Sequence, residues 1–169
     1  TELSNDGFTQ GERWLERRGF NLRAVLDVCA FPRDLAAAWD QTHIPRIPGQ
    51  RLVLLGMGGS GLWDWMSGQD LLDDADPFDV VSRQAALEVA ERFWGDPAPR
   101  LLYPGDTLIP LQQLGRWAGW SVPSPLGLDV SPIFGPWFAF RAAMLTMTTL
   151  PFSERGPVVS PCDTCEDPP

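Results

Sequence analysis

A single charged residue, Arg141, interrupts the longest apolar run of this 169-residue chain, which lies within Pro123–Leu150. Burying a guanidinium group without a partner costs several kcal/mol, so arginine inside an apolar run requires a compensating group. We expect that group to be a carboxylate such as that of Asp129, a cluster of carbonyl oxygens, or a ligand. In the last case the planar guanidinium would bind amide or carboxylate oxygens.

A second candidate site is the glycine-rich segment 56–61, which fits the pattern G-x-G-x-x-G and follows a predicted strand. In dinucleotide-binding proteins this pattern opens a long helix, and an acidic residue lies on a second strand about 20 residues later. Here two tryptophans, Gly68 and an acidic loop with Pro77 follow instead. We therefore expect a turn of glycines, with a nucleotide site as the weaker alternative.

A third candidate is the pair Cys162 and Cys165, which has the C-x-x-C spacing of iron–sulfur and zinc sites. Both kinds of site need more ligands, and the remaining soft ligands, Cys29 and His43, lie far upstream. A closed metal site within these 169 residues is therefore not expected. The spacing is typical of the start of a ferredoxin-type run whose further cysteines would follow Pro169.

The composition excludes several classes of function. The net charge is −9 and all 13 basic residues are arginines without a basic run, so we do not expect a nucleic-acid partner. With one histidine, Ser-His-Asp and Cys-His catalysis are poorly supported. No apolar segment of membrane-spanning length and no signal peptide are visible, and three cysteines argue against a disulfide framework. These features favour a cytoplasmic protein without a membrane partner.

The elements that must position these residues form an α+β pattern, because helices and strands mix without strict alternation. The spacing of apolar residues and the capping residues predict helices over 11–18, 32–41, 62–68, 82–94 and about 106–119. Ser82 is the expected N-cap of the fourth helix, and Leu108 is expected on the inner face of the fifth. Strands are predicted over 20–28, 51–55, 100–103 and 138–148. In the last strand Phe138, Phe140, Ala142 and Met144 should share one face, and Arg141 the other.

The segment Gly127–Arg141, GLDVSPIFGPWFAFR, resembles a segment of the cblC-type cobalamin-processing proteins. The matching positions are Gly127, Pro132, Phe134, Gly135, Trp137, Phe138, Ala139 and Arg141. The resemblance implies a nitroreductase-like fold, with a central mixed or antiparallel sheet flanked by helices and a corrinoid bound over it. It also implies cobalamin held with its lower base displaced, and reductive removal of its upper ligand. The implied cofactor-binding residues are Gly127, Ser131, Phe134, Gly135, Trp137, Phe138 and Arg141.

The resemblance covers most of residues 20–150 and divides the chain into an arm with a short helix (1–19), a corrinoid-binding domain (20–152) and an irregular tail (153–169). Its implied partners are a corrinoid and a thiol or flavin reductant, with a homodimer left open and FMN as a weaker alternative cofactor. Ser131 stands where cblC proteins often carry histidine, which favours a non-catalytic cobalamin carrier or sensor as an alternative. Epoxyqueuosine reductases share a related segment, followed by an iron–sulfur domain. Cys162 and Cys165 lie where its cysteines would begin, so an iron–sulfur reductase domain is a further alternative.

Overall fold

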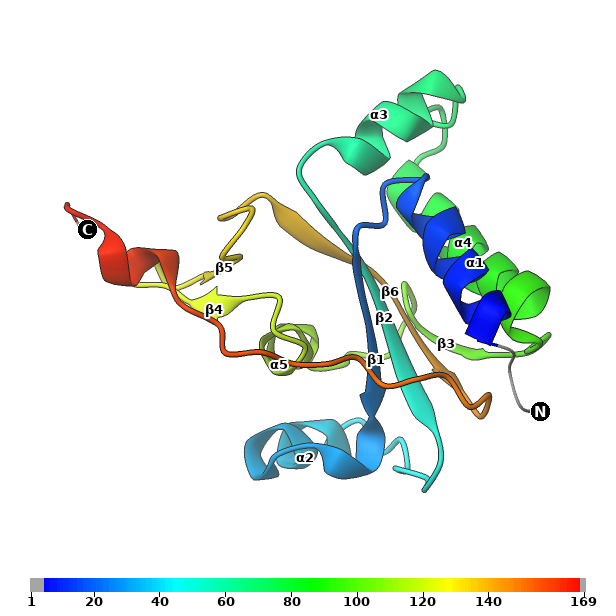
Figure 1. The fold of residues 1–169 in the computed structure, drawn as a ribbon, viewed down its shortest axis with the longest axis horizontal. Coiled ribbons are helices and arrows are strands. Elements are labelled where there is room, and N and C mark those ends of the chain that lie inside the picture. Colours follow the sequence, from blue (N-terminus) through cyan, green and yellow to red (C-terminus); the bar gives the residue numbers. More distant parts are fainter. Residues whose placement is uncertain (1–4, 168–169) are drawn as a thin grey trace.

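A four-stranded antiparallel sheet forms the centre of the computed structural model, which describes residues 5–167 (Figure 1). Its strands lie in the order β1-β2-β6-β3. Their bounds are β1 Leu22–Asp27, β2 Arg51–Gly58, β3 Arg100–Tyr103 and β6 Phe138–Thr146. The two central strands, β2 and β6, are rich in buried Leu, Val, Ala and Met, as expected for strands covered on both faces.

Helices cover both faces of the sheet. On one face, α1 (Asn5–Glu16), α3 (Gly61–Gly68) and α4 (Pro77–Trp94) enclose a core that includes Trp14, Met66 and Trp94. On the other, α2 (Arg33–Asp40) and α5 (Leu111–Trp117) enclose a second core that includes Trp39 and Leu114. The predicted α+β class is therefore confirmed.

Several predicted boundaries were wrong at helix starts. The first helix begins at Asn5, inside the predicted arm. The helix expected from Ser82 begins at Pro77, a residue suited to a first turn, and Ser82 is buried within it. The helix expected from about residue 106 begins at Leu111, which leaves Leu108 92% exposed rather than on an inner face. At α4 and α5 a proline marks the observed start, as the first residue of α4 (Pro77) and the residue before α5 (Pro110).

A β-bulge in β6 changes the predicted faces of that strand. In the pairing with β2, Leu55 lies opposite Ala142 and Gly56 opposite Phe140, so Arg141 has no cross-strand partner. A bulged residue shifts the alternation by one position. Phe140 therefore packs on the α5 side and Ala142 on the α4 side, whereas simple alternation predicted a shared face.

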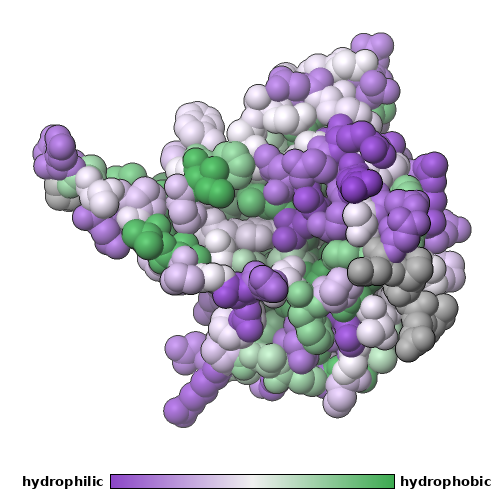
Figure 2. All heavy atoms as spheres, in the orientation of Figure 1, coloured by the Kyte–Doolittle hydropathy of each residue, from purple (hydrophilic) through white to green (hydrophobic). Residues whose placement is uncertain are grey.

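A small hairpin and the tail complete the fold. Strands β4 (Val122–Pro123) and β5 (Asp129–Val130) form a separate two-stranded sheet, and the tail contains one 3-10 turn, η2 (Pro161–Thr164). Hydrophobic residues gather at the surface beside this hairpin and the tail (Figure 2). Exposed apolar residues include Leu126 and Leu128 in the hairpin, Ile133 in the loop that follows it, and Val159 in the tail. Within residues 5–167, no helix has the length and apolar character to cross a membrane.

Candidate functional site

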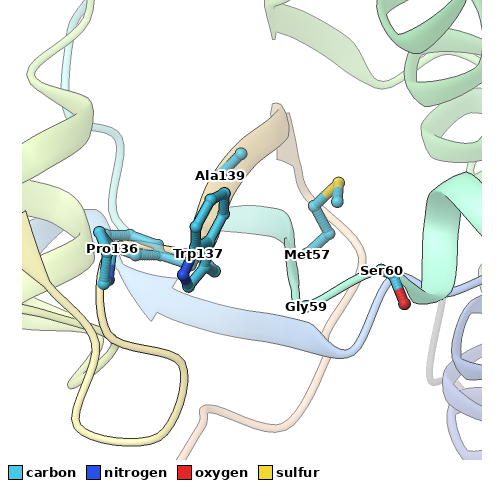
Figure 3. A pocket seen from close by; sticks show the side chains of 7 residues that line it. Met57, Gly59, Ser60, Pro136, Trp137 and Ala139 are labelled. Atoms are coloured by element: carbon cyan, nitrogen blue, oxygen red, sulfur yellow. The ribbon is translucent and has the colours of Figure 1, made fainter.

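The glycine-rich segment, the loop before β6 and the first residues of β6 line an open apolar pocket of about 430 Å³ (Figure 3). Pro136 and Trp137 lie on one side of it, Met57 and Ser60 on the other, with Gly59 between them. The full lining is Met57, Gly59, Ser60, Pro136, Trp137, Phe138 and Ala139. Two of the motifs singled out in the sequence therefore meet at one place in the fold.

Backbone pairing between β2 and β6 fixes the two sides of the pocket. Met57 pairs with Ala139 and Gly58 with Phe138, and the ladder is extended by the N–H of Gly59, which donates to the carbonyl of Trp137 at 2.9 Å. The side chain of Asn21 also holds Gly58, accepting from its N–H at 2.8 Å and donating to its carbonyl at 2.9 Å. The glycine segment is thus held from both sides.

The loop 131–137 is closed by its own hydrogen bonds. Ser131 and Gly135 exchange backbone hydrogen bonds of 2.7 and 2.9 Å, and Gly135 has φ +58°, a conformation that favours glycine. The Ser131 hydroxyl accepts from the N–H groups of Ile133 and Phe134, both at 3.2 Å, and the residue is 2% exposed. Ser131 therefore shapes the loop, and it does not line the pocket.

The walls of the pocket carry no ionisable side chain. Its one hydroxyl, that of Ser60, donates to Asp64 at 2.8 Å. Trp137 is 77% exposed although it lies in an apolar stretch, so one broad aromatic surface faces solvent at the rim. Such a lining suits a flat apolar ligand and provides no general acid or base.

Arg141 has no ion pair and no side-chain hydrogen bond among residues 5–167, and its Nε is buried without a partner. Its guanidinium carbon lies 5.2 Å from the ring centroid of Phe78, at the start of α4. Asp129, the carboxylate considered as its partner, is paired with Arg116 instead and accepts hydrogen bonds from it at 2.9 and 2.7 Å. The proposed Asp129–Arg141 pair is therefore wrong, and the hydrogen bond to Asp129 raises the pKa of Arg116.

The glycine pattern lacks the surroundings of a dinucleotide site. β2 runs antiparallel to both neighbours, β1 and β6, whereas that site requires a parallel β-α-β unit. The helix that follows, α3, has eight residues. The close approach of backbone and ring explains the glycines better, because the ring of Phe134 packs against Gly58 and leaves no room for a Cβ atom there.

Three other predicted residues lie away from the pocket lining. Gly127 has φ +76° in the turn between β4 and β5, where its N–H donates to the carbonyl of Ser124 at 3.1 Å. Cys162 lies on η2 in the tail and Cys165 directly after it, and both are free thiols. Within residues 5–167, no group of three or more His, Cys, Asp or Glu side chains is placed to hold a metal ion.

The sequence predicted Trp137 and Phe138 as ligand-site residues, but not Met57, Ser60 or Pro136. The available signal was the glycine pattern, which indicated a close backbone approach without indicating what approaches it. Comparison of the chain with protein-family models and with curated proteins gave no match.

Proposed function

We propose that this chain binds a corrinoid such as cobalamin at the pocket lined by Met57 and Trp137, and assists reductive removal of its upper ligand. The observation that carries the proposal is the union of two segments in one apolar pocket: the glycine-rich segment 56–61 and the cblC-like segment 127–141. We extend the proposal to a nitroreductase-like fold, supported by a central antiparallel sheet with helices on both faces.

The shape of the pocket suits part of a flat macrocycle. Glycine backbone lets a ligand approach closely because no side chain intervenes, and an exposed tryptophan offers a broad apolar face. The volume of about 430 Å³ lies within the range of about 300–1,000 Å³ usual for small-molecule sites. A whole cobalamin is larger than this pocket. The pocket would therefore hold one side of the corrin ring, and the rest of the ring would extend past Trp137 toward solvent.

Because the pocket walls lack ionisable groups, the protein's own residues would bind and orient the corrinoid and exclude water from its covered side. A bound corrinoid supplies the redox chemistry through its cobalt. Arg141 lies two residues along β6 from the lining residue Ala139 and would hold a polar edge of the ligand. The same lack of an acid or base supports the carrier alternative, in which cobalamin is held without turnover. Free thiols at Cys29, Cys162 and Cys165 are consistent with the proposed reducing cytoplasm.

Titration with hydroxocobalamin, followed by visible absorption, tests the proposal. We expect saturable binding with the spectral shift that accompanies displacement of the lower base. A single-turnover assay with a thiol or reduced flavin then separates the enzyme from the carrier. An unchanged cobalamin spectrum at high protein concentration would exclude the proposal, and a protein that purifies yellow would favour FMN instead.

Replacing Trp137 with alanine should weaken cobalamin binding at least about tenfold, which corresponds to about 1.4 kcal/mol. Because the side chain is mostly exposed, the free energy of unfolding should change by no more than about 0.5 kcal/mol. Leu108→Ala is the matched control, since Leu108 is exposed and lies outside the pocket lining. Equal affinities for the two variants would remove Trp137 from the site.

Replacing Arg141 with methionine should raise the free energy of unfolding by about 1 kcal/mol, because it removes a buried donor that lacks a partner. The same change should weaken cobalamin or thiol binding, since the guanidinium is lost. Urea denaturation measures the first effect, and spectroscopic titration the second. Arg141→Lys keeps the charge and should retain part of the affinity. A large loss of stability with unchanged affinity would show that the arginine is structural.

A further inference from the structure

The tail carries two free cysteines on one tight turn. Cys162 lies within η2 and Cys165 caps it, with the N–H of Cys165 donating to the carbonyl of Cys162 at 3.2 Å. Residues three apart in a 3-10 helix lie on the same side, because this helix has three residues per turn. This turn therefore brings the backbones of the two cysteines close together.

Local hydrogen bonds hold this turn. The hydroxyl of Ser160 accepts from the N–H of Cys162 at 3.2 Å, and Pro161 occupies the first position, where its fixed φ suits the turn. Cys162 is half-buried and Cys165 is exposed, so an ion could reach both thiols from solvent. The backbone that carries the pair is held by these bonds before any ligand arrives.

The charges around the pair favour a cation. Asp163 lies between the two cysteines, and Glu166 and Asp167 follow directly. The sequence contains no basic residue after Arg155. Opposite charge within a few ångströms attracts a cation even where water screens the interaction.

We propose that Cys162 and Cys165 bind one soft metal ion that accepts a low coordination number, such as copper(I). Thiolates select soft ions, whereas structural zinc and iron–sulfur clusters take four ligands. Within the described part of the chain, no third His, Cys, Asp or Glu joins the pair. An ion satisfied by two thiolates therefore fits what this turn offers.

This site does not depend on the proposed corrinoid pocket, because the two share no residue. Failure of cobalamin to bind would leave the metal proposal intact, and the reverse also holds. The two titrations can therefore be interpreted separately on the same preparation.

Anaerobic titration of the reduced full chain with copper(I), in competition with a bicinchoninate chelator, tests the proposal. We expect one ion per chain, and at least a hundredfold weaker binding for Cys162→Ser and for Cys165→Ser. Cys29→Ser is the matched control, because it removes an exposed free cysteine outside the turn, and its affinity should be unchanged. Silver(I) should give the same stoichiometry.

Two results would overturn the proposal. Equal losses for Cys29→Ser and the tail variants would indicate unspecific thiol binding. Native mass spectrometry showing two chains around one zinc ion, or around an iron–sulfur cluster, would indicate a four-thiolate site shared between copies. Circular dichroism of each variant checks that the fold is retained.

Discussion

Replacing Gly19 with alanine is expected to lower the free energy of unfolding by at least about 3 kcal/mol. This is the largest loss of stability predicted for the addition of one methyl group to this chain. Gly19 has φ +87°, a region that L-residues rarely adopt. A Cβ atom there would also overlap the backbone of Gly61 and Leu62 at the start of α3. Backbone cannot rotate away as a side chain can, so the link between α1 and β1 would have to move.

Gly95→Ala is the matched control for this prediction. Gly95 also has positive φ, at +68°, and ends α4, but a Cβ atom there would meet no atom within 4 Å. It should therefore cost only the conformational strain, about 1 kcal/mol. Urea denaturation of both variants isolates the steric part as their difference. Equal losses would show that the overlap of the added Cβ atom with α3 carries no steric penalty.

Replacing Gly58 with alanine is expected to displace the ring of Phe134 and so disrupt the pocket. The added Cβ atom would overlap that ring, and Phe134 belongs to the loop whose end, Pro136 and Trp137, forms one wall. Overpacking of this kind costs about 1–3 kcal/mol. Cobalamin affinity should fall at least about tenfold, because the wall moves relative to Gly59.

Two variants make the Gly58 prediction specific. Gly68→Ala, at the end of α3, meets no atom within 4 Å and should leave both stability and affinity nearly unchanged. Adding Phe134→Leu to Gly58→Ala should restore part of the lost stability, because a smaller side chain leaves room for the methyl group. If the double variant is no more stable than Gly58→Ala, the contact between Gly58 and Phe134 is not the cause.

Much of the secondary structure follows from local patterns. The apolar run Leu52–Leu55 predicts a buried strand, and Gly19 and Gly95 stop their helices because each adopts a positive φ that glycine accommodates. His43 lies in an exposed turn that follows α2, with φ +58°. These features depend on neighbours in the sequence, which is why they could be predicted.

The partners of the candidate site depend on the tertiary structure. Arg141 is bulged because β2 sets the register of β6, and no property of the segment 138–146 alone reveals that. Asp129 could have paired with either arginine, but its place in β5 brings it to Arg116 on the neighbouring helix.

By itself, the sequence determined the α+β class, most of the elements and the two segments at which a ligand site was expected. Only the tertiary structure decided that these segments form one pocket, that Trp137 faces solvent, and that the Ser131 hydroxyl accepts hydrogen bonds within its own loop. The physical reason is the distance along the chain over which each kind of interaction acts. Turns, caps and periodicity act over a few residues, whereas strand pairing and packing join residues far apart in the chain.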